Sequence, residues 1–251
     1  MTRALTAREP DTCSWPYRVR FDEAGPDGLL RTSTLLRYAQ DLAAFHSAKR
    51  GFDRVWYAER GLTWLARTAA VAVTGSIGHG AELTGTTRVV GARRVWARRR
   101  TEFTSQDGVL VAWAHVDWVL LDARGTPIRI PPDLEAAFGT PGATFPLGRV
   151  DVGEPPEEAA HRTFIVRPYE LDPMDHANNA VYADWVDEGV IAAGGMTATR
   201  AIPRIVRLEY ALPAEPKAVM AASTWPVDGG WSYRLTGPQG SELLRARIDP
   251  G

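Results

Sequence analysis

The stretch YRVRFDEAGP at residues 17–26 reappears as FIVRPYELDP at residues 164–173. The two copies align without a gap at one offset, 164 minus 17, or 147 residues, and Val, Arg, Glu and Pro coincide. The offset continues past each copy, where Tyr38 corresponds to Trp185 and both belong to an amphipathic stretch. This repeat predicts that one supersecondary unit occurs twice in the chain.

The two copies differ in the turn that follows them. Residues 172–179 read DPMDHANN, which brings two acids, an imidazole and two amides together. Where the second copy has Asp172, His176 and Asn178, the first copy has Gly25, Leu29 and Arg31. A turn needed for folding alone has little reason to be polar in one copy only. We therefore expect the second copy to carry the chemistry and the first to be a structural or substrate-binding partner.

The polar turn is predicted to join a strand to a helix. Residues 163–170 are rich in β-branched and aromatic side chains, and apolar residues recur at helical spacing after Ala180. Asn178 or Asn179 can cap that helix, because a short amide side chain accepts a hydrogen bond from a first-turn backbone donor. The remaining donors can polarise a substrate carbonyl. The alternative is that both amides are only caps and Asp172 only a turn residue.

The remaining pattern predicts an α+β fold made of two similar units. In the first unit a strand near residues 17–21 precedes an amphipathic helix over 34–48 and a short helix near 53–59. Strands are then expected at residues 63–74, 82–92, 95–105 and 109–122. The second unit repeats this order, with later strands near residues 202–211, 218–224, 231–235 and 242–248. Each helix should pack on one face of an antiparallel sheet.

The bulk properties narrow the classes of function. The formal net charge of -1 argues against general attraction to nucleic acid or to an anionic membrane. The single cysteine, Cys13, excludes an internal disulfide and leaves secretion without support. No apolar run approaches the roughly 20 residues of a membrane span, and residues 1–12 lack a signal-peptide core. We expect a cytoplasmic protein that uses no metal or cofactor.

Three segments together resemble one known family. They are LTWLAR at residues 62–67, the turn at 172–179 with Tyr182, and RLEY at residues 207–210. The combination is similar to the acyl-acyl carrier protein (acyl-ACP) thioesterases. The resemblance covers about residues 15–248 and implies two tandem hotdog units, each a long helix wrapped by an antiparallel sheet. The Asp-Pro-x-x-His element also resembles single-unit hotdog acyl-CoA thioesterases, which leaves the carrier open.

The resemblance implies a division of the chain and a partner. Residues 14–138 are expected to form a non-catalytic, acyl-binding unit, residues 139–160 an exposed linker, and residues 161–249 the unit with the catalytic turn. The expected reaction is hydrolysis of an acyl thioester, which releases a free carboxylic acid in fatty acid or polyketide biosynthesis. An acyl carrier protein is the expected partner, and a homodimer is compatible with tandem units.

The functional residues of the family fall on named positions of this chain. The resemblance implies that Asp172, His176 and Asn178 are catalytic. The expected substrate-binding residues are Asn179, Tyr182, Trp64 and Met174. In the expected mechanism Asp172 acts on water as a general base, or attacks as a nucleophile, while His176 orients the water or the carboxylate. Backbone N–H groups near Asn178 and Asn179 stabilise the oxyanion.

Two departures from the family pattern concern this site. The catalytic Asn of the family, two residues after the Asp, is here Met174, which cannot donate an amide hydrogen bond. The acid and the cysteine in the strand that follows RLEY fall on Pro213 and Ala214, although Glu215 can serve if the register shifts. Asp172 is therefore the acid common to both hotdog patterns.

Two clusters in the first unit have both a functional and a structural interpretation. The arginines that flank Trp96 suit docking of an acidic carrier protein or a solvated strand edge; they are Arg93, Arg94, Arg98, Arg99 and Arg100. The tryptophans of this unit can line an acyl tunnel or fill the core. Trp113 and Trp118 are five residues apart on one strand and must point to opposite faces.

Two other classes of protein remain open. Double-hotdog dehydratases remove water from a 3-hydroxyacyl thioester and need a His followed by a Gly-Pro-rich turn. His46, His79 and His115 have no such surroundings. Met174 and the missing strand acid favour a non-catalytic acyl or carrier-protein binding module. Release of a free thiol, formation of an enoyl product, or binding without either outcome distinguishes the three.

Overall fold

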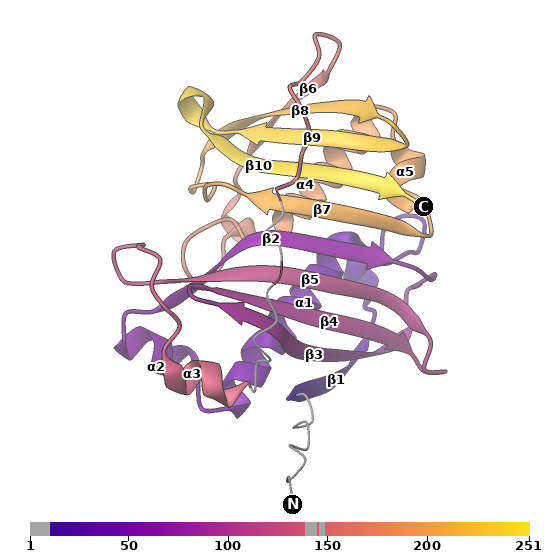
Figure 1. Ribbon diagram of the computed structural model, residues 1–251. Coiled ribbons are helices and arrows are strands. Elements are labelled where there is room, and N and C mark those ends of the chain that lie inside the picture. Colours follow the sequence, from indigo (N-terminus) through magenta and orange to yellow (C-terminus); the bar gives the residue numbers. More distant parts are fainter. Residues whose placement is uncertain (1–10, 139–144, 146–148) are drawn as a thin grey trace, which may run out of the picture.

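The computed structural model describes residues 11–138, 145 and 149–251, which form one ten-stranded antiparallel sheet (Figure 1). The strands of the N-terminal half are β1 (Thr12–Arg18), β2 (Thr63–Val73), β3 (Glu82–Arg93), β4 (Trp96–Ser105) and β5 (Leu110–Leu121). Those of the C-terminal half are β6 (Ala160–Ile165), β7 (Arg204–Tyr210), β8 (Val219–Val227), β9 (Gly230–Thr236) and β10 (Glu242–Pro250). The order β1-β3-β4-β5-β2-β7-β10-β9-β8-β6 repeats one half in reverse and joins the halves at β2 and β7.

The sequence repeat is visible in the backbone. A short 3-10 helix at Phe21–Glu23 recurs at Pro168–Glu170, at the offset of 168 minus 21, or 147 residues. The same offset relates two isolated β-bridges, Ala24↔Leu30 and Leu171↔Ala177. The chain therefore carries the same strand-turn-helix path twice, as the repeat predicted.

The two long helices, α1 (Thr32–Lys49) and α4 (Val181–Ala192), lie on one face of the sheet (Figure 1). They contact each other at equivalent positions, because Arg37 Nη2 donates to Asp184 Oδ2 at 2.8 Å and the two residues are 147 apart. Leu35, Tyr38 and Leu42 of α1 are buried, as their helical spacing predicted. This contact places the first turn of α4 beside the second turn of α1.

Three short helices complete the fold. The predicted α2 (Arg54–Glu59) begins after Asp53, whose side chain accepts from the Trp56 N–H. Neither α3 (Pro132–Ala137) nor α5 (Met196–Arg200) shows a periodic pattern in its residues, since each is little more than one turn long. Leu134 of α3 is buried in a second core cluster that covers one end of the N-terminal half. In the described part of the chain, none of the helices is long and apolar enough to cross a membrane.

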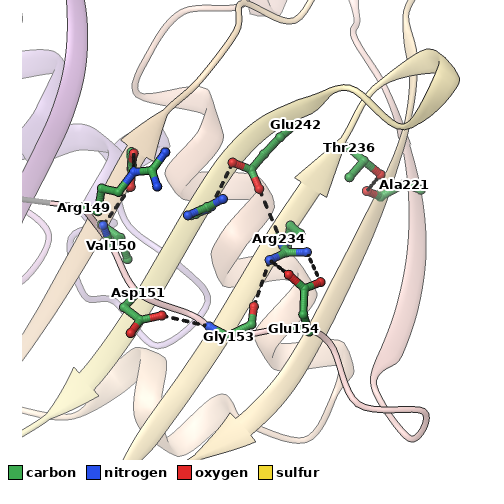
Figure 2. Close-up of polar contacts among 11 residues, drawn as sticks. Arg149, Val150, Asp151, Gly153, Glu154, Ala221, Arg234, Thr236 and Glu242 are labelled. Carbon is green, nitrogen blue, oxygen red and sulfur yellow. Dashed lines mark hydrogen bonds and ion pairs between the residues drawn. The ribbon is translucent and has the colours of Figure 1, made fainter.

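The segment between the halves is less exposed than predicted. Its described residues cross the sheet face opposite to α4 (Figure 2). Val150 and Val152 are buried there against Trp225 of β8. Arg234 of β9 donates from Nη1 to Glu154 Oε2 at 2.7 Å (Figure 2). Residues 139–144 and 146–148 of the expected linker lie outside the described residues, as do residues 1–10 of the N-terminus.

The arginines of β4 do not form one surface. The strand-edge interpretation is wrong, because β4 lies between β3 and β5. Arg98 pairs with the buried Asp117 at 2.6 Å on the outer face of the sheet. Arg99 points to the opposite, helix-covered face and is buried. The alternation of a strand divides this basic stretch between two environments.

Candidate active site

The turn after the second 3-10 helix fixes the carboxylate of Asp172. Oδ1 accepts hydrogen bonds from the N–H groups of Met174 at 2.8 Å and His176 at 3.4 Å. The Asp172 N–H donates to the His176 carbonyl at 2.8 Å. Asp175 has a φ of 61°, a backbone conformation that Asp tolerates better than most residues. Oδ2 accepts no hydrogen bond from any described residue, so one carboxylate oxygen remains available.

The start of α4 is capped by Asn178. Its Oδ1 accepts from the Ala180 N–H at 2.9 Å, and its carbonyl accepts from the Val181 N–H at 2.9 Å. Its own N–H donates to the Glu170 carbonyl at 2.9 Å. The Asn179 N–H, in contrast, has no acceptor among the described residues. One backbone donor therefore remains unused at the positive end of α4.

Two adjoining cavities meet at the turn. The large one has a volume of about 730 Å³ and lies in the N-terminal half, between α1, α2, α3 and the inner face of β3, β4 and β5. The small one, of about 80 Å³, lies between the start of α4 and the facing ends of β2 and β7. Five side chains line both cavities: Gln40, Trp64, Trp118, Asp172 and Met174. The turn of the second copy thus closes a chamber that the first copy builds.

The residues expected at the site divide between the two cavities. Asp172, Met174 and Trp64 line both of them, whereas His176, Asn179 and Tyr182 line only the small one. Asn178 lines neither, because its side chain is turned back to cap the helix. Apart from Asn178, the structure brings the expected residues together around one junction.

Models of protein families match both halves of the chain. The model of the acyl-ACP thioesterase N-terminal domain matches residues 11–138, and that of the C-terminal domain matches residues 153–244. The chain belongs to the acyl-ACP thioesterase family. The resemblance seen in the sequence is thereby confirmed, together with the two-unit hotdog fold and the hydrolysis of an acyl thioester. The dehydratase alternative is not supported.

Solved structures of low sequence identity share the fold of this thioesterase over nearly its whole length. A Lactobacillus plantarum protein assigned as an oleoyl thioesterase is 18% identical, with a TM-score of 0.85 and coverage of 96% of both chains. The 12:0-ACP thioesterase from Umbellularia californica is 21% identical, with a TM-score of 0.80 and coverage of 95% of this chain and 96% of the other. An acyl-ACP thioesterase from Bacteroides thetaiotaomicron is 13% identical, with a TM-score of 0.80 and coverage of 95% and 97%. No curated protein matches the chain in sequence.

The strand acid expected after RLEY is missing from the site of this thioesterase, and Glu215 does not replace it. Pro213 lines the small cavity and Ala214 is buried behind it. Glu215 is exposed and lines neither cavity, so no register shift brings its carboxylate to the junction. Of the described residues around the small cavity, Asp172 alone carries a carboxylate.

Two tyrosines stiffen the small cavity of the thioesterase. The Tyr182 hydroxyl accepts a hydrogen bond from the Ala214 N–H at 2.7 Å, and burial raises the pKa of Tyr182 to about 12. The Tyr210 hydroxyl donates to the Asn179 carbonyl at 3.0 Å, and burial raises the pKa of Tyr210 as well. Both phenols are neutral at ordinary pH. Tyr182 ties the helix to the loop after β7, and Tyr210 fixes the peptide next to the free Asn179 N–H.

Three further residues line the cavities: Gln40 was not expected there, Arg67 of the LTWLAR segment had no assigned role, and Trp118 was one of the tryptophans considered for an acyl tunnel. Gln40 extends from α1 to the junction, and its amide has no hydrogen-bond partner in the described part of the chain. Arg67 of β2 lines the small cavity and donates from Nη1 to the Ala211 carbonyl at 2.7 Å. Trp118 lines both cavities, on the face of β5 opposite to that of Trp113, which packs under Arg100. No local motif marks Gln40, because it meets the turn only through the packing of the two copies.

Proposed function

We propose that this thioesterase hydrolyses acyl-ACP at the junction of the two cavities, with Asp172 as the general base. The observation that carries the proposal is the position of Asp172, whose fixed carboxylate lines both the large and the small cavity. The acyl chain then occupies the large cavity and the thioester carbonyl lies at the junction. The first copy supplies the acyl chamber and the second copy the acid.

The reaction is addition of water to the thioester carbonyl followed by loss of the thiol. The free Oδ2 of Asp172 takes a proton from the attacking water. The unused Asn179 N–H, at the positive end of α4, donates to the oxyanion that forms on the carbonyl oxygen. When the carbon–sulfur bond breaks, Asp172 returns this proton to the thiolate of the carrier, which leaves as the free thiol. His176 lines the small cavity and is near enough to this step to orient water.

Gln40 supplies an amide near the point where the family pattern has a catalytic Asn and this chain has Met174. Gln40 and Met174 line the same two cavities as Asp172, and Met174 is 44% exposed with only a weak contact from the Thr63 hydroxyl to its sulfur at 3.5 Å. An amide can donate to a water and accept from it at the same time. Gln40 therefore holds the water against Asp172, whereas Asn178 acts indirectly by capping the helix.

A thiol-release assay on acyl-ACP and acyl-CoA thioesters of matched chain length tests this function. We expect release from acyl-ACP by the wild-type chain and a large loss in Asp172→Asn. Binding of acyl-ACP without any thiol release would instead identify a non-catalytic binding module. Faster hydrolysis of acyl-CoA than of acyl-ACP would agree with thioester hydrolysis but would contradict ACP as the carrier.

The biological setting remains a proposal of the same kind. The family supports ACP as the carrier, and a biosynthetic role in the cytoplasm agrees with a net charge of -1 and a single buried cysteine, Cys13. The homodimer stays a prediction. Sedimentation of the purified chain measures its mass in solution and decides that point.

A further inference from the structure

A buried cation faces the large cavity. Arg99 of β4 is only 9% exposed and lines the cavity from the sheet side. Its Nη1 donates to His46 Nδ1 at 2.9 Å, and its guanidinium lies over the ring of Phe138 at 5.4 Å. No carboxylate of the described residues forms an ion pair with it. Arg99 is thus a nearly buried guanidinium with one hydrogen bond to an acceptor among residues 11–138, 145 and 149–251.

The neighbouring acid does not neutralise Arg99 directly. Asp11 accepts from His46 Nε2 at 3.1 Å and is also paired with Arg50, so the imidazole ring separates its carboxylate from the Arg99 guanidinium. Burial, and then the charge of Arg99, lowers the pKa of His46 to about 4, which keeps the imidazole neutral. Burial also lowers the pKa of Arg99, to about 10, so Arg99 is still a cation at neutral pH. The charge is retained although its environment opposes it.

Tyr57 is the polar side chain nearest in effect to the Arg99 charge, but no described residue besides His46 accepts a hydrogen bond from the guanidinium. Phe52, Ile130, Leu134 and Trp118 line the same cavity with apolar side chains. A guanidinium has five N–H donors in a fixed fork. An unsubstituted alkyl chain in this cavity would remove water from those donors without replacing its hydrogen bonds. An acyl group with an oxygen at this depth would supply the missing acceptor.

We infer that Arg99 selects acyl groups that carry a hydrogen-bond-accepting oxygen on their distal part: a hydroxyl, keto or carboxyl group far from the thioester. This inference rests on the proposed function. Arg99 on β4 lies two strand spacings, or about 10 Å, across the sheet from β2. It is also displaced along the strands from Trp64, because Arg99 pairs with Val116 and Trp64 with Leu120, four residues further along β5, or about 13 Å. The oxygen is therefore expected well beyond the carbons next to the thioester. The preferred substrate class is an oxygenated acyl thioester rather than a plain saturated one.

The test compares ACP thioesters of one chain length that differ only at the distal end: methyl, hydroxyl, keto or carboxyl. With the wild-type chain we expect a higher kcat/KM for the oxygenated members. Arg99→Met, which keeps length and removes the donors, should lower kcat/KM for them by about 10-fold or more, the usual effect of a charged hydrogen bond. The same variant should leave the methyl-terminated substrate unchanged or improve it. Arg100→Met, on the outer face of the same strand, is the matched control.

Two outcomes separate the inference from the proposed function. Equal kcat/KM for methyl-ended and oxygenated thioesters in both the wild type and Arg99→Met overturns the role of Arg99 and leaves hydrolysis intact. If no thioester is hydrolysed, thermal stabilisation by the free acids is measured instead. Selective stabilisation by hydroxy, keto or dicarboxylic acids that is lost in Arg99→Met still supports recognition of a distal oxygen by Arg99. Arg99→Lys, which keeps the charge, covers the case in which the methionine variant does not fold.

Discussion

Replacing Asp172 with asparagine tests the proposed base with little disturbance of the turn. The amide oxygen keeps the place of Oδ1, so the N–H groups of Met174 and His176 keep an acceptor. Loss of the negative charge weakens each of these hydrogen bonds by about 1 kcal/mol. Loss of the proton acceptor at Oδ2 lowers kcat by roughly 10²-fold to 10⁴-fold, or about 3 to 5 kcal/mol of activation free energy. The effect on turnover should therefore exceed the effect on stability.

The assay is thiol release from saturating acyl-ACP, with thermal unfolding measured on the same preparations. Asp175→Asn is the matched control, because Asp175 is exposed in the same turn, lines neither cavity and has a φ that Asn also adopts readily. We expect this control to keep nearly the wild-type kcat. A folded Asp172→Asn protein with wild-type turnover, or an equal loss in both variants, would refute the assignment.

The other predictions concern the amide at the junction, the buried phenol and a half-buried acid on α4. Gln40→Leu should lower kcat by up to about 10-fold, the effect of one hydrogen bond, and Met174→Asn added to it should restore part of the loss; no recovery in the double variant would contradict the role of the amide. Tyr182→Phe leaves the buried Ala214 N–H without its acceptor and should lower the free energy of unfolding by about 1 to 3 kcal/mol in a denaturant titration; an unchanged midpoint would argue against that hydrogen bond. Burial raises the pKa of Asp187 from 3.8 to about 7, so its contribution is complete below about pH 4 and is lost as the pH rises through 7. Asp187→Asn should therefore unfold at a higher temperature than the wild type at pH 8 but not at pH 4, and parallel pH profiles would exclude this residue as the cause.

The strands and the long helices could be predicted because their signals are local. Alternation and turn residues placed β2 at 63–74 against an observed Thr63–Val73, and β5 at 109–122 against Leu110–Leu121. The first strand of the second unit was extended too far, because residues 163–170 include a 3-10 helix at Pro168–Glu170 that has no pattern of its own. The repeat predicted the topology of the second unit, because a constant offset implies that its elements occur in the same order as those of the first.

The candidate site could be predicted only where the chemistry is contiguous in sequence. The turn from Asp172 to Asn179 was recognisable from its residues alone. Its position over the chamber of the other copy was not, because Gln40 is 132 residues away, 172 minus 40, and reaches the turn through the packing of α1. The burial of Arg99 was hidden for a similar reason, as five nearby arginines look alike until the strand alternation separates them.

The pairing of β2 with β7 has a consequence for hybrid proteins. These two strands and the Arg37–Asp184 contact are the seam between the halves, and the seam runs from Thr68↔Glu209 to Val73↔Arg204. A chimera that takes its first half from a relative and keeps this seam matched would inherit a new chamber while the native acid stays in place. The preference for an acyl chain would then change with the first half, while the ability to hydrolyse the thioester would stay with the second.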